Sequence, residues 1–126
     1  LKYIDGWNIE RVRIAELYRK YLSESINITP NYQDDGSHVF HQYVVRVPNR
    51  DKVQSLMDKQ GIKTLIHYPV PIFDQKAYEE LSYIGNEFEL TRKLANEVLS
   101  LPIYPGLSER DIMKISEVLL KALKDV

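Results

Sequence analysis

The side chains best suited to chemistry in this sequence are His67 and the tyrosine that follows it, Tyr68. They end a β-rich run and stand directly before Pro69-Val70-Pro71, where each residue that precedes a proline is held in extended geometry. An imidazole and a phenol both donate and accept hydrogen bonds, so on a stiff loop they suit recognition of a hydroxyl-rich ligand. The spacing of the residues alone is almost equally consistent with an ordinary surface histidine at position 67.

The other two histidines predict no metal site. His38 and His41 are three positions apart in a predicted strand, where such residues point to opposite faces and cannot share one ion. We expect a surface His38 and a half-buried, hydrogen-bonded His41. The sequence has no Cys, which excludes disulfides, thiolate metal ligands and thiol nucleophiles and fits a reducing cytoplasm.

Other catalytic patterns are missing from the sequence. The carboxylate pairs Asp34-Asp35 and Glu79-Glu80 are sequence neighbours whose side chains diverge, so we interpret them as solvated. No serine occupies a Gly-x-Ser-x-Gly elbow, and the 5 Gly are isolated, which excludes a glycine-rich phosphate loop. Most lysines fall on predicted polar faces, whereas a Schiff-base lysine needs a desolvated or otherwise depressed amine. The residues therefore predict no catalytic or metal-binding side chain.

Length and composition are typical of one soluble globular domain, which we place at residues 1–126. The chain is 44% hydrophobic, and its 17 basic and 18 acidic residues are interspersed, giving a net charge of -1. Nothing in that balance attracts nucleic acid or an anionic membrane, and no apolar run is long enough to span a bilayer. The chain starts at Leu1 in what reads as a segment already under way, so we expect a larger protein.

Hydrophobic periodicity and turn residues predict the elements that must position His67 and Tyr68. In the first half we expect a helix over Trp7–Leu22, an edge strand over Ile26–Thr29, a turn at Asp34–Ser37, a strand over Val39–Val47, and a helix over about Arg50–Gln60. Asn49 is the predicted N-cap of that last helix, and Gly61 is its predicted left-handed terminator.

The second half begins with a β-rich run over Ile62–Tyr68. We then expect a short helix over Gln75–Tyr83, a longer helix over Glu87–Ser100, and a last helix opened by a Ser108-x-x-Asp111 capping box with an inward stripe of Ile112, Ile115, Leu119 and Ala122. The strand, helix, strand order permits a parallel pair, but three strands with helices on one face fit as well.

Three ordered stretches of the chain resemble one known family. They are His38–Val47 with Asn49-Arg50-Asp51, then the Gly-Ile-x-Thr-x-x-His-Tyr-Pro-x-Pro segment Gly61–Pro71, and finally Ala95–Pro105. Together they resemble the C-terminal third of the DegT/DnrJ/StrS-type sugar aminotransferases, and the similarity covers essentially the whole chain. The order and spacing of all three stretches make the resemblance specific.

That resemblance implies an α+β fold: a small three- to four-stranded, mainly antiparallel sheet with helices packed on one face, as in the small domain of a fold type I aminotransferase. It implies that pyridoxal 5'-phosphate (PLP) is bound by the chain's own N-terminal large domain, in a cytoplasmic enzyme that is a homodimer when full length. The family moves an amino group, typically from glutamate, to a keto group of a nucleotide-linked sugar for deoxysugar or cell-surface polysaccharide biosynthesis.

Of the family's functional positions, His67 and Tyr68 match the loop that frames the sugar-nucleotide pocket, and Gln75 and Tyr78 follow it as further substrate-binding candidates. No Schiff-base lysine or other cofactor-binding residue of the family pattern matches this chain, so we expect the isolated chain to be inactive. Two other classes stay open: a free-standing α+β ligand-binding or regulatory module, and a domain that only mediates dimerisation, suggested by the 9 Tyr.

Overall fold

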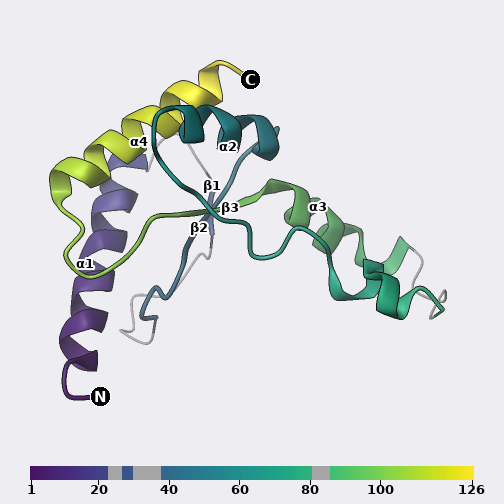
Figure 1. The fold of residues 1–126 in the computed structure, drawn as a ribbon, viewed down its shortest axis with the longest axis horizontal. Coiled ribbons are helices and arrows are strands. Elements are labelled where there is room, and N and C mark those ends of the chain that lie inside the picture. The colour runs from purple at the N-terminus through teal and green to yellow at the C-terminus, as the bar shows by residue number, and fades with distance from the viewer. Residues whose placement is uncertain (23–26, 30–37, 81–85) are drawn as a thin grey trace.

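The computed structural model describes residues 1–22, 27–29, 38–80 and 86–126. The helices and strands, shown in Figure 1, are α1 (Ile4–Leu22), β1 (Asn27–Thr29), β2 (Tyr43–Arg46), α2 (Arg50–Lys59), α3 (Glu89–Glu97), β3 (Val98–Leu101) and α4 (Glu109–Lys124). Between α2 and α3 lie the 3-10 turns η1 (Ile72–Asp74), η2 (Lys76–Tyr78) and η3 (Asn86–Phe88). The predicted turn at 34–37 lies outside the described residues.

Among the residues that the structure describes, the sheet has three strands in the order β1-β2-β3, and both pairings are antiparallel. Val45, at its centre, is opposite Ile28 on one side and Leu99 on the other. The predicted α+β class with a mainly antiparallel sheet is confirmed, as is the edge strand near residue 28. The parallel pair that the element order also permitted does not form within the described part of the chain.

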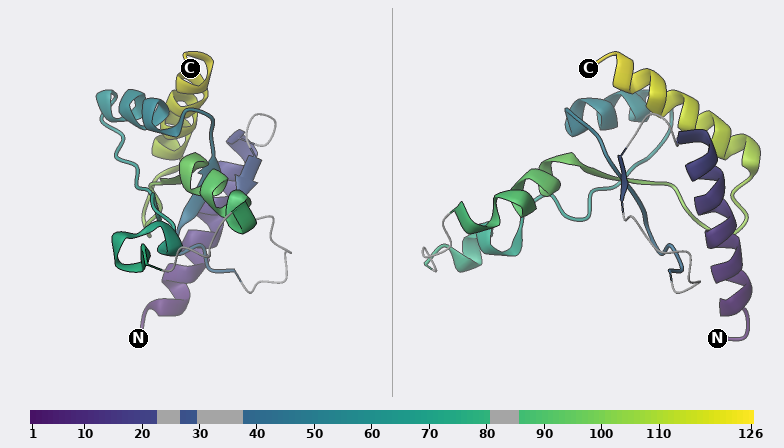
Figure 2. Two further views of the ribbon diagram at one scale, coloured as in Figure 1. Left: turned by 90° about the vertical axis from the view of Figure 1, so that its right-hand side faces the viewer. Right: turned by 180° about the vertical axis from the view of Figure 1, so that it is seen from behind.

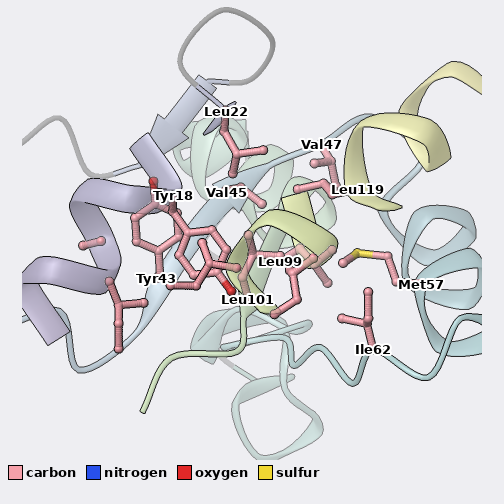
Figure 3. Close-up of a cluster of buried hydrophobic side chains, with 14 of the residues drawn as sticks. Tyr18, Leu22, Tyr43, Val45, Val47, Met57, Ile62, Leu99, Leu101 and Leu119 are labelled. Atoms are coloured by element: carbon pink, nitrogen blue, oxygen red, sulfur yellow. The ribbon is translucent and has the colours of Figure 1, made fainter. Parts of the chain in front are cut away.

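The core lies on one face of the sheet, against which α1, α2 and α4 place their apolar side chains (Figure 3). Alternate residues of β2 and its extension are buried, whereas the residues between them are partly exposed, as expected for a sheet covered on one side. The largest fully buried side chains include Tyr18, Phe40, Ile14, Leu22, Met57, Leu99, Ile112 and Leu119. Tyr18 stacks on Tyr43 at 4.8 Å between ring centroids, and its hydroxyl donates to the backbone oxygen of Pro102 at 2.8 Å.

Helix α4 is the element that the sequence predicts best. The Asp111 amide donates to the Ser108 hydroxyl oxygen at 3.1 Å, and this hydroxyl donates to the Asp111 carboxylate at 2.6 Å. The short aspartate thus bonds the cap side chain, whereas a glutamate in this motif reaches back to the cap amide. Every residue of the predicted stripe is buried: Ile112, Ile115, Leu119 and Ala122.

The predicted strand over Val39–Val47 is too long, because regular pairing starts only at Tyr43. Phe40 adopts a left-handed φ of 48°, which turns the chain and buries its ring at 2% exposure. The turn also reverses the expected histidine environments. His41 is exposed, whereas His38 is partly buried and its Nδ1 accepts a hydrogen bond from the Phe40 amide at 3.1 Å.

The predicted strand over Ile62–Tyr68 is reduced to one antiparallel bridge, Leu65 with Ser100. The predicted helix over Glu87–Ser100 is also wrong at its end, because α3 stops at Glu97 and Val98–Leu101 forms β3. Leucine and valine at this spacing satisfy a helix face and a buried strand alike, and pairing with β2 decides the outcome. Over the described part of the predicted helix Gln75–Tyr83, the chain forms the short η2 turn instead.

The predicted cap of α2 is wrong in its chemistry. Asn49 precedes the helix in a left-handed conformation with φ 45°, and its side chain makes no capping hydrogen bond. Its backbone oxygen instead accepts from the amides of Lys52 and Val53. Gly61 does end the helix region with φ 75°, a value that favours glycine.

Residues 67–80 and 86–97, which we call the arm, project away from the body formed by α1, α2 and α4 (Figures 1 and 2). The arm contains the η turns and α3, and it joins the sheet through β3 at one end and through the Leu65 bridge at the other. None of the described helices has the length and apolarity of a membrane span.

Replacing Leu119 by alanine tests the assignment of the core. The side chain is fully buried between α4 and the sheet, so Leu119→Ala should lower the free energy of unfolding by about 2–5 kcal/mol in denaturant titrations followed by circular dichroism. Met113→Ala on the same helix is the control, because Met113 is 41% exposed and its loss should change stability far less. Equal effects of the two variants would contradict the assignment.

Candidate functional site

The candidate site is built around His67, which lies just beyond the Leu65 bridge. Leu65 and Ser100 exchange two backbone hydrogen bonds, 3.1 Å from the Leu65 amide and 2.8 Å from the Ser100 amide. Two residues further on, Nδ1 of His67 lies 2.9 Å from Oγ of the buried Ser100. The imidazole is therefore tied to β3, and its Nε2 has no hydrogen-bond partner among the residues that the structure describes.

Tyr68 is at the surface beside this imidazole. Its side chain is 74% exposed, and its ring meets the His67 ring edge-on with centroids 5.6 Å apart. The peptide bond between the two residues is cis. The structure thus brings together the two side chains that the sequence singles out, and it leaves the tyrosine hydroxyl open to a ligand.

A groove of about 350 Å³ runs along the arm beside them. One wall is the loop from His67 through η1, and the other is formed by α3 and the start of β3. The lining residues are His67, Tyr68, Val70, Pro71, Ile72, Phe73, Thr91, Leu94, Ala95 and Val98. An apolar groove with a few polar groups at one end is the usual form of a small-molecule site.

The two walls are joined near η1 by a cluster of contacts. The Arg92 guanidinium donates to both carboxylate oxygens of Asp74, with the closest pair 2.8 Å apart, and lies 5.0 Å above the Phe73 ring. Phe73 also stacks on Phe88 at 5.0 Å. The hydrogen bonds from Arg92 lower the pKa of the Asp74 carboxyl, and both groups keep their charge near neutral pH.

At its base, α3 is attached to the body by two arginines. Buried Arg50 donates through Nη1 to the backbone oxygens of Ala95 and Val98, at 3.0 and 3.1 Å. Arg46 of β2 bonds the Glu97 carboxylate through Nε at 3.0 Å and Nη2 at 2.6 Å. These contacts fix the direction in which α3 leaves the sheet, and hence the position of one groove wall.

Gln75 and Tyr78, the other two predicted substrate-binding residues, stand at η2 and do not line this groove. Both are exposed, and the Tyr78 amide donates to the Gln75 backbone oxygen. The sequence gives no signal for the roles of Ser100, Phe73 and Arg92, which hold the site together. Arg92 is separated from Asp74 by 18 positions, so no local pattern links them, and Ser100 lies in a segment whose spacing predicts a helix.

A larger hollow of about 640 Å³ lies at the N-terminal half of α1 and includes Trp7, Arg11 and His41. Arg11 donates through Nη1 to the backbone oxygens of His41 and Ile103 at 3.1 and 3.2 Å, a structural use of its charge. Within the described residues, no three His, Asp or Glu side chains are grouped to hold a metal ion.

The chain is similar in sequence to a known protein family. The sequence model of the DegT/DnrJ/EryC1/StrS aminotransferase family matches residues 1–120. A pleiotropic regulatory protein of Geobacillus stearothermophilus is 36% identical over 91% of this chain, and the dTDP-3-amino-3,6-dideoxy-alpha-D-galactopyranose transaminase of Aneurinibacillus thermoaerophilus is 38% identical over 93%. The chain spans 32% of the length of each of these relatives.

Among solved structures, S. venezuelae DesV in complex with a ketimine intermediate superposes with a TM-score of 0.84 at 33% identity. The match covers 100% of this chain and 34% of DesV. The fold described above is therefore that of one third of a longer relative.

The ion pair between the groove walls can be tested by titration. Replacing Arg92 by glutamine should raise the pKa of Asp74 toward the ordinary carboxyl value, measured by carboxyl NMR shifts against pH. Because the folded-state pKa is lowered, the stabilisation by the pair is present near neutral pH and disappears as the pH falls through that pKa. Lys93→Gln, on the neighbouring exposed residue, is the control. An unchanged Asp74 midpoint in Arg92→Gln would refute the pairing.

Proposed function

Because the chain belongs to the DegT/DnrJ/EryC1/StrS aminotransferase family, we propose that it forms the C-terminal domain of a PLP-dependent enzyme. In this proposal the whole enzyme transfers an amino group from glutamate to a keto group of a nucleotide-linked sugar. The observation that supports a role for this chain is the His67-Tyr68 pair at the mouth of an apolar groove. The transaminase activity of the relative from A. thermoaerophilus agrees with the sugar class.

PLP itself does not fit the groove that the described residues of this chain form. The groove lining contains no lysine for a Schiff base, no carboxylate for a pyridinium nitrogen and no cluster of amides or cations for a phosphate. We therefore assign the cofactor to the N-terminal large domain, where it would supply the electron sink for amino transfer. The isolated chain is inactive in this division of labour.

The proposed task of the groove is to bind and orient the sugar nucleotide. His67 presents its free ring nitrogen, and Tyr68 its hydroxyl, on a backbone held by the Leu65 bridge and the following prolines. Such rigid support reduces the conformational entropy that the loop and its two side chains lose when they bind a ligand. Gln75 and Tyr78 stay proposals for contacts further from the groove.

In this proposal, the domain in this chain has two partners: the N-terminal large domain of the same protein and a second copy of the protein in a homodimer. The enzyme acts in the cytoplasm. The product class, amino sugars linked to nucleotides, serves deoxysugar or cell-surface polysaccharide biosynthesis.

Substitution of His67 in the longer protein tests the assignment. His67→Ala should raise KM for the nucleotide sugar about three- to tenfold, the loss of one hydrogen bond worth about 0.7–1.4 kcal/mol, with KM for glutamate unchanged. Tyr68→Phe should act in the same direction. Tyr104→Phe is the matched control, since Tyr104 is 53% exposed and outside the groove. Unchanged sugar KM in both groove variants would favour a ligand-free dimerisation or structural role.

The assignment of PLP to the N-terminal large domain can be tested separately. PLP added to the 126-residue chain should give no Schiff-base absorbance and no lysine modified after borohydride reduction at stoichiometric cofactor. The longer protein should give both. A stoichiometric, reducible adduct at one lysine of the isolated chain would overturn the assignment of PLP to the large domain.

A further inference from the structure

Ser100 carries a further inference because its side chain has a single partner in the described structure. It is 6% exposed on β3, and its hydroxyl lies 2.9 Å from Nδ1 of His67. Its backbone amide and carbonyl are both used by Leu65, so the serine is fixed at its main chain as well as at its side chain. A buried hydroxyl held in this way needs an acceptor for its hydrogen.

The ring nitrogen is the only acceptor recorded for that hydrogen within the described residues. If Nδ1 carried a proton, it would donate to Ser100, and the serine hydrogen would be left buried without a partner. If Nδ1 is unprotonated, the hydroxyl donates to it, and the buried serine hydrogen and the Nδ1 lone pair satisfy each other. The second arrangement therefore has the lower energy for a neutral imidazole.

We propose that Ser100 is a positioning residue that holds neutral His67 in the Nε2–H tautomer. The imidazole then presents a hydrogen-bond donor, rather than an acceptor, to a ligand in the groove. The matching ligand atom is an oxygen acceptor, such as a sugar hydroxyl or ring oxygen. The choice of this ligand rests on the proposed function, whereas the tautomer rests on the serine contact alone.

The tautomer is measured directly by long-range proton–nitrogen NMR of the 126-residue chain at alkaline pH, where imidazoles are neutral. In the unmodified chain, the His67 Nδ1 resonance should be pyridine-like and that of Nε2 pyrrole-like. Ser100→Ala should move both resonances toward the average of the two tautomers, and Ser100→Thr should restore them. Ser116→Ala is the matched control, because this buried serine bonds a backbone oxygen within α4.

A pyrrole-like Nδ1 in the unmodified chain, or resonances that do not change in Ser100→Ala, would overturn the inference. If Ser100→Ala fails to fold, the unmodified chain alone still shows which ring nitrogen of His67 carries the proton.

In the longer protein, Ser100→Ala should raise KM for the nucleotide sugar about two- to fivefold, less than His67→Ala, with Ser100→Thr near the unmodified value. If His67→Ala changes this KM and Ser100→Ala does not, the positioning role fails while the proposed function stands. If His67→Ala has no effect, the proposed function fails, and the NMR result still decides the tautomer.

Discussion

The backbone pairing of Leu65 with Ser100 is the interaction on which the site depends. These two hydrogen bonds are the sole ladder contact that the described residues make between the 62–68 segment and the sheet. They fix the point along β3 from which the following loop departs, and thereby place the His67 ring beside the Ser100 side chain. Without that anchor, the prolines that follow would stiffen a loop that had no fixed starting point.

Much of the body could be predicted from the sequence because its signals are local. The spacing of apolar residues in α4 and the serine three positions before Asp111 describe one helix and its cap, and both depend on neighbours along the chain. The edge strand near Ile28 follows from a short β-branched run that ends at a proline. These local preferences predict the structure correctly because the tertiary contacts of the body favour the same helix and strand.

The strand β3 and the bend at Phe40 could not be predicted in the same way, because contacts distant in sequence determine them. Val98 and Leu101 fit a helix stripe in isolation and become a strand only because Tyr43 and Arg46 lie opposite them. The left-handed Phe40 likewise gives no signal in sequence and shortens a strand that alternates correctly. The stiff loop singles out His67 and Tyr68 as candidates in the sequence, whereas the contact of Ser100 with the imidazole depends on the position of β3.

The arm also separates the groove from the core residues that stabilise the fold. Its groove lies outside the buried cluster formed by α1, α2, α4 and the sheet, and its walls are joined mainly by the partly exposed Asp74–Arg92 pair and the Phe73–Phe88 stack. Residues such as Val70, Ile72 and Thr91 can therefore change with little consequence for folding of the body. If the groove binds a sugar nucleotide as proposed, substitutions there can change its selectivity while the core, and with it the stability of the body, is retained.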